Sequence, residues 1–145
     1  MAIILDFPER LETTSLAKKE INSFLGKEEY HIAVLFASIY ANIRLRSLVT
    51  DWKNPQKDDW KKTSQRIDPF NFGRLLGTCN KLKLLANEEY VTLDRLRVKR
   101  NEVAHESRLW KANIQETEKN EMKTLCESAI RFLEATNEKR LSHQH

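Results

Sequence analysis

The stretch IAVLFASIYANI, residues 32–43, decides how the rest of the chain is interpreted. Wound as an α-helix, one of its sides carries Ile32, Phe36, Ile39 and Ile43. Val34 and Leu35 fall on other sides, so the helix is apolar nearly all round. Such a helix must be surrounded, either at the centre of a bundle or between two subunits. We therefore expect a long central helix from near Glu28 to Trp52.

The flanking segments also space their apolar residues as helices do, and none alternates convincingly with the period of a strand. A first helix is expected from about Thr14 to Leu25, with Leu16 and Ile21 on its apolar side and Gly26 as its stop. Three later helices are expected: one over about 72–85, one with Asn87 as its N-cap, and one that begins near Thr117. Since the chain has only three glycines and three prolines, the sequence predicts an all-α, up-and-down bundle of about five helices.

The length of 145 residues fits one domain, residues 1–145, in which we expect 139–145 to be a disordered tail. Residues 51–71 contain two prolines and many charges, which predicts a long loop. Cys79 and Cys126 lie on helical apolar faces and form no CxxC motif, so we interpret both as core residues. Neither a secretory signal nor a membrane span is evident, so a cytoplasmic protein is expected.

A charged stretch, LRVKRNEVAHES at 96–107, ends the fourth expected helix. At about 100° per residue, Arg100 falls about 20° from Leu93 and lies between the apolar residues of its own helix. Burying a cation without a partner costs several kcal/mol. Arg100 must therefore either pair with a buried carboxylate or face a cleft or an interface.

Asn101 and His105 form a ridge beside that apolar stripe, one turn apart. Arg100 and His105, however, differ by about 140° on an ideal helix. They can meet only if the helix ends or bends near Ala104, or if a second copy of the chain supplies half of the site.

The motif Arg100–Asn101–His105 resembles the R-x4-6-H signature of HEPN domains (higher eukaryotes and prokaryotes nucleotide-binding). The similarity extends to residues 28–49, which resemble the long second helix of such domains, and to 70–97, which resemble the approach to the motif. It covers roughly residues 14–138. The sequence departs from many relatives at Asn42, where they carry an acidic residue, and at Ser107, where one toxin subgroup carries Tyr.

The resemblance implies a metal-independent endoribonuclease, without a cofactor, that dimerises so that two motifs face one another. It also implies a toxin or a host-defence effector, with a possible antitoxin protein as partner. RNA supplies its own nucleophile, the 2′-hydroxyl. His105 could take that proton or protonate the departing oxygen, and Arg100 could bind phosphate oxygens through its planar guanidinium. Asn101 could orient His105 or contact phosphate.

Basic residues close in sequence to the motif are candidates for guiding RNA: Lys81, Lys83, Arg95, Arg97 and Lys99. The formal net charge of +4 permits an anionic partner without requiring one. Two other interpretations stay open. One is a catalytically silent HEPN-like module that binds RNA or nucleotides or regulates other proteins. The other is a structural bundle in which Arg100 is only a core ion-pair partner.

Overall fold

The computed structural model describes residues 7–53, 71–106 and 114–138, and every regular element in these ranges is helical. The prediction of an all-α helical bundle is confirmed. The helices are α1 (Phe7–Gly26), α2 (Tyr30–Lys53), α4 (Phe72–Lys81), α5 (Asn87–His105) and α6 (Glu116–Ala135). The long loop predicted over 51–71 and the tail over 139–145 lie largely or wholly outside the described residues.

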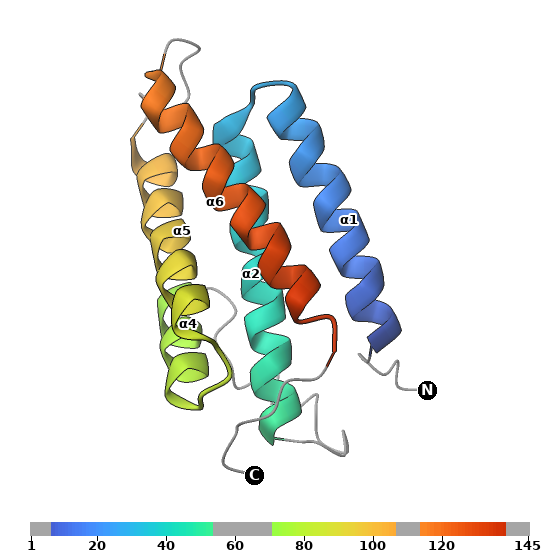
Figure 1. Ribbon diagram of the computed structural model, residues 1–145. Helices are drawn as coiled ribbons and strands as arrows, with labels where there is room; N and C mark the ends of the chain where they lie inside the picture. Colours follow the sequence, from blue (N-terminus) through green and yellow to red (C-terminus); the bar gives the residue numbers. More distant parts are fainter. Residues whose placement is uncertain (1–6, 54–70, 107–113, 139–145) are drawn as a thin grey trace.

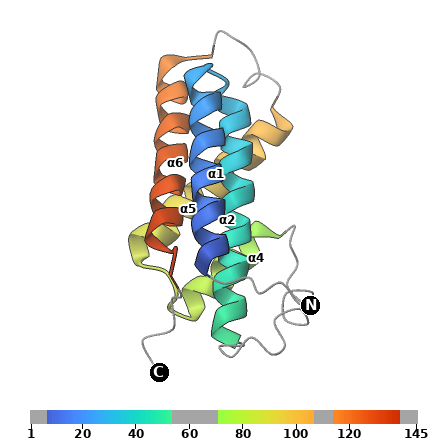
Figure 2. The same ribbon diagram turned by 90° about the vertical axis from the view of Figure 1, so that its right-hand side faces the viewer.

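The bundle is built around α2, which packs against each of the other four helices. The long helices α1, α2, α5 and α6 alternate in direction, and the shorter α4 lies beside one end of α5 (Figure 1). A view from the side shows α1, α2 and α6 running close together (Figure 2). The core that they enclose includes Val34, Leu45, Leu48, Leu93 and Leu133, each at most 1% exposed. The apolar stretch 32–43 thus lies at the centre of a bundle, one of the two places that its composition allows.

Local sequence explains most of the helix ends. Glu28 adopts a positive φ of 58° in the short turn that follows Gly26, and α2 begins two residues later. The side chain of Asn71 accepts a hydrogen bond from the Arg74 amide (2.9 Å), which caps the N-terminus of α4. This cap fixes the start of α4 next to Phe72, a residue of the candidate site described below.

Three details differ from the sequence-based expectations. The first helix begins at Phe7 rather than near Thr14, and Leu16 lies on its exposed side. Asn87 is the first residue of α5 and not its cap, because Ala86 occupies the N-cap position. The Glu89 carboxylate accepts a hydrogen bond from the Ala86 amide (2.8 Å) and does the work expected of Asn87.

Both cysteines are buried core residues, as predicted. Burial raises the pKa of each thiol to about 12, and the charge of Glu127 adds to the shift at Cys126. A thiol that stays protonated is a weak nucleophile, so neither residue is a candidate for nucleophilic chemistry.

A guanidinium that the sequence did not single out is the most buried cation in the described part of the chain. Arg44 of α2 is 2% exposed. It donates to the Leu133 carbonyl (2.6 Å) and the Thr136 hydroxyl (2.9 Å) at the end of α6, and to the Arg10 carbonyl (3.1 Å) and the Thr14 hydroxyl (3.0 Å) of α1. Burial lowers the pKa of Arg44 to about 10, and the nearby charge of Arg10 contributes.

A second buried arginine, Arg10, lies at the same end of the bundle and has a carboxylate partner. Arg10 forms a buried ion pair with Asp51, near the end of α2, and donates to the Ser47 hydroxyl through both Nε (2.9 Å) and Nη2 (2.6 Å). Its third nitrogen donates to the Glu138 carbonyl (3.0 Å). The two arginines therefore join α1, α2 and the end of α6 at one end of the bundle.

Within the described residues, α2 is the helix long and apolar enough to cross a membrane by length and composition. About half of its apolar window, 56%, is buried inside the bundle, and the core helix of a soluble protein passes the same test. The absence of a membrane span stays a prediction.

We expect Arg44→Ala to lower the free energy of unfolding by about 3–5 kcal/mol, because it removes four hydrogen bonds that the guanidinium donates in the core and opens a cavity. The matched control is Arg131→Ala on the exposed side of α6, which should change stability by no more than about 0.5 kcal/mol. Chemical denaturation of both variants tests this. Equal free energies of unfolding for the parent and Arg44→Ala would show that the hydrogen bonds of Arg44 contribute nothing to stability.

Candidate functional site

Arg100 lies on α5 at the edge of the surface that packs on the bundle. Its neighbours Leu96 and Val103 are fully buried, whereas Ala104 is exposed and Arg100 itself is partly buried. Among the described residues, its hydrogen-bond partner is the Asn101 side chain, at 3.4 Å, and it forms no ion pair with a carboxylate. The sequence allows Arg100 either a buried carboxylate partner or a position at a cleft or an interface. In the structure, Arg100 faces a cleft.

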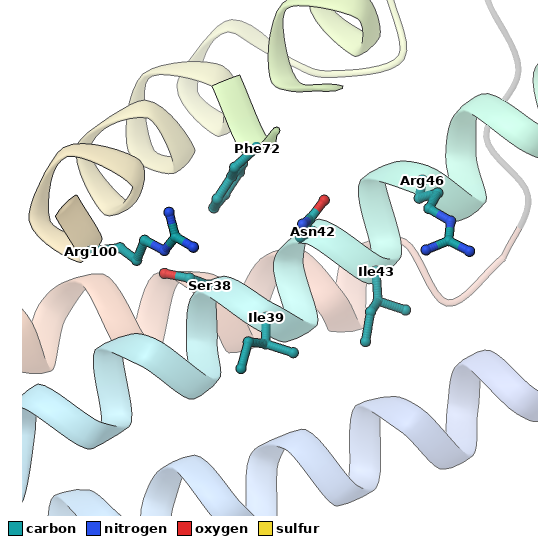
Figure 3. Close-up of a pocket in the computed structure, with 7 residues that line it drawn as sticks. All are labelled: Ser38, Ile39, Asn42, Ile43, Arg46, Phe72 and Arg100. Atoms are coloured by element: carbon teal, nitrogen blue, oxygen red, sulfur yellow. The ribbon is translucent and has the colours of Figure 1, made fainter. Parts of the chain in front are cut away.

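The cleft is a pocket of about 210 Å³ between α2, the start of α4 and α5. Its described lining residues are Ser38, Ile39, Asn42, Ile43, Arg46, Phe72 and Arg100. Figure 3 shows Arg100 entering from α5 at one end, Arg46 at the other end, and Phe72 across from α2. None of these residues is acidic, so the pocket carries two guanidinium groups and no carboxylate from the described part of the chain.

The α2 side of the pocket follows from helical spacing. Ser38, Asn42 and Arg46 are each four residues apart, which gives a polar row along α2, and Ile39 and Ile43 form an apolar row beside it. The motif analysis did not find Ser38, Arg46 or Phe72, because these residues lie far from Arg100 in sequence. The spacing of the polar row was the signal that could have found the first two.

Asn42 was noted because many HEPN relatives carry an acidic residue there. The structure places it in the same pocket as Arg100, from a different helix. The position at which the resemblance to HEPN domains expects a carboxylate thus lines the same pocket as Arg100, but with an uncharged amide. This substitution keeps the pocket more positive than an acidic residue would.

His105 lies apart from the pocket. It is exposed at the last residue of α5, and α5 remains helical through it, because the Glu106 amide still donates to the Glu102 carbonyl (2.7 Å). The helix continues through Ala104 and ends at His105, so Arg100 and His105 leave it about 140° apart around its axis, as on an ideal helix. Asn101 is hydrogen-bonded to Arg100 and, within the described ranges, not to His105.

Lys99, one of the expected RNA contacts, has intramolecular partners. It is 6% exposed, and its ammonium contacts the carboxylates of Glu102 (2.7 Å) and Glu121 (3.3 Å). Burial lowers the pKa of Lys99, but the two carboxylates outweigh burial and hold it above its usual value. Lys99 is therefore an ion-pair residue between α5 and α6, and we leave it out of the proposed RNA surface.

The other basic candidates are dispersed. Arg97 packs against Gly73 at the start of α4, where an added Cβ would lie 3.3 Å from its Cδ, and its Nε pairs with Asp94 (3.0 Å). Arg95 is exposed on the outer side of α5. Lys81 and Lys83 lie at the opposite end of α4 from Phe72, about 15 Å away along a helix of ten residues. Only Arg97 thus lies beside the pocket.

The surface next to the pocket is unusually apolar. Ile39 is 54% exposed and Ile43 is 48% exposed, although both belong to the central helix. The bundle therefore leaves this side of α2 uncovered, although the sequence predicted that the helix is surrounded.

Comparison with known proteins leaves the family unassigned: no protein-family model, no curated protein and no solved structure matches this chain. The likeness to HEPN domains stays a prediction from the motif. Within residues 7–53, 71–106 and 114–138, no group of three or more His, Cys, Asp or Glu side chains could hold a metal ion.

We expect Arg100→Ala to leave the free energy of unfolding within about 0.5 kcal/mol of the parent or to raise it, because no buried carboxylate loses a partner. Arg10→Ala is the matched contrast: it leaves Asp51 buried without its partner and should cost about 3–5 kcal/mol. Thermal and denaturant unfolding of both variants measure this. If Arg100→Ala lowers the free energy of unfolding as much as Arg10→Ala does, Arg100 has a structural role.

Proposed function

We propose that the protein is a metal-independent endoribonuclease that cleaves RNA by attack of the 2′-hydroxyl. The observation that carries the proposal is the environment of Arg100: a guanidinium with no carboxylate partner in the described chain, directed into a pocket that also contains Arg46 and has no acidic lining residue. A cation that folding leaves uncompensated suits an anionic ligand, and RNA phosphate is such a ligand.

The residue types match the chemistry. The planar guanidinium of Arg100 can bind two phosphate oxygens at once, which stabilises the charge that builds on phosphorus. His105 is exposed at the end of α5, where it can exchange protons with a bound strand and with water. Asn101 holds the Arg100 side chain through its amide oxygen, and Arg97 lies nearby as a further phosphate contact.

A single chain keeps Arg100 and His105 on different sides of α5, so the proposed enzyme is a homodimer. The second copy would bring its His105 toward Arg100 of the first copy. The partly uncovered α2 residues Ile39 and Ile43 lie beside the pocket and provide apolar surface for such a contact. In this proposal the protein acts in the cytoplasm as a toxin or defence effector, with an antitoxin protein as a possible further partner.

A second function is favoured by Asn42 and by the position of His105. An RNA-binding or nucleotide-binding module needs the cationic pocket but neither the acidic residue of many relatives nor a histidine beside the arginine. Such a module would bind RNA through Arg100 without cleaving it.

The test incubates purified protein with labelled RNA in the presence of a chelator. We expect cleavage by the parent, and a loss of at least about 100-fold in the His105→Ala variant, because general acid–base catalysis contributes about that much. Arg100→Lys should restore little of the activity lost in Arg100→Ala, since an ammonium lacks the planar fork. Arg131→Ala is the matched control and should cleave as the parent does.

Two results would contradict the enzyme. Cleavage by His105→Ala at the parent rate would show that His105 takes no part. Binding of RNA by the parent without cleavage, lost in Arg100→Ala, would instead identify the silent module.

The dimer is tested by sedimentation at micromolar concentration. We expect the parent to sediment as a dimer and Ile39→Asp/Ile43→Asp to sediment as a monomer with unchanged helix content, because two carboxylates cannot be buried at this contact without partners. Leu16→Asp, an equally exposed leucine of α1, is the control and should leave the dimer intact. A parent that stays monomeric would exclude a site shared between copies.

A further inference from the structure

We infer that the pocket between α2, α4 and α5 binds one unpaired nucleotide of a single-stranded RNA, with Arg100 and Arg46 on the phosphates at its two ends. The inference rests on the proposed function in taking RNA as the ligand, and it adds a binding residue, Arg46, and a strand requirement. Three features of the pocket carry it: its size, the distribution of its charges and its apolar sides.

The pocket has room for a single aromatic group and not for a drug-sized ligand. Its volume is about 210 Å³, below the roughly 300–1,000 Å³ of pockets that take drug-sized ligands. A base in a duplex is stacked and paired and cannot enter a pocket of this kind without being extruded, which costs a few kcal/mol. An unpaired base enters at much lower cost.

The charges lie at the ends of the pocket. Arg100 and Arg46 come from different helices and lie at opposite ends of the group of lining residues (Figure 3). Along α2, Ser38 and Arg46 are eight residues apart, about 12 Å of helix. From opposite ends of the pocket, the long side chains of the two arginines can each extend toward a phosphate, one on either side of the bound base.

The middle of the pocket suits a base. Phe72 lies on one side and Ile39 and Ile43 on another, so a planar aromatic ring has apolar surfaces to pack against. Asn42 lies between the two arginines and carries both a donor and an acceptor, the combination that can contact a base edge. A site that binds phosphate alone does not need apolar side chains beside its cations.

The test measures binding rather than cleavage, by fluorescence anisotropy of labelled oligonucleotides whose 2′-deoxy sugars cannot provide the nucleophile. Three probes of equal length are compared: a single strand, the same strand paired with its complement, and a single strand of abasic sites. We expect the single strand to bind at least about fivefold more tightly than either of the others, since stacking of one base is worth that much.

The role of Arg46 is tested by the dependence of affinity on salt. Loss of one phosphate contact on a single strand should reduce the slope of log affinity against log salt by about 0.7 in Arg46→Ala. Arg46→Lys, which keeps the charge, should retain the parent slope, and Arg131→Ala should match the parent in both slope and affinity. Melting curves establish that the variants are folded. If Arg46→Ala does not fold, the affinities of the parent protein for the three probes test the inference.

Equal affinity for the single strand and the duplex, or for the abasic strand, would overturn the inference. So would a folded Arg46→Ala variant with an unchanged slope. Failure of the proposed function is distinguishable: a parent that cleaves no RNA but prefers the single strand, with an Arg46-dependent slope, excludes the ribonuclease and leaves the nucleotide pocket in place.

Discussion

The buried guanidinium of Arg44 constrains this bundle more than any other polar group that the structure describes. A cation at 2% exposure is tolerable only if most of its donors are satisfied, and its partners come from both α1 and α6. The helices must therefore sit at one register relative to α2, because a shift along any axis would leave donors and carbonyls unpaired. Apolar packing alone would tolerate more sliding than this network does.

The same register positions the pocket. With α2 held by Arg44, the residues two positions away on either side, Asn42 and Arg46, line the pocket. On the other side of the pocket, the ion pair of Lys99 with Glu121 ties α5 to α6 next to Arg100. The pocket is therefore lined by helices whose orientations are fixed by charged groups outside it.

The sequence predicted the class of fold because no segment alternated with the period of a strand, glycine and proline were few, and Gly26 marked the end of α1. It missed the first turns of α1, which begins at Phe7. It placed Arg100 within the apolar stripe of α5, whereas the structure has Arg100 at the edge of the packed surface, because Ala104 is exposed. It could not distinguish Arg44 from a surface arginine, since burial of that residue depends on acceptors from α1 and α6, which are distant in sequence. For the same reason Lys99 and Lys81 looked equivalent, although one is held by Glu121 of another helix and the other lies at the far end of α4.

The placement of the Arg44 acceptors has a consequence for how the chain folds during synthesis. Leu133 and Thr136 belong to the last helical turn of α6 and the residue after it, so they leave the ribosome some ninety residues after Arg44 itself. Until then the guanidinium has only its α1 acceptors and favours a hydrated environment. The emerging α1–α2 hairpin therefore cannot reach its final burial early, and completion of the core is deferred until α6 has been made. A cation in the central helix thus makes the order of folding depend on the last helix of the bundle.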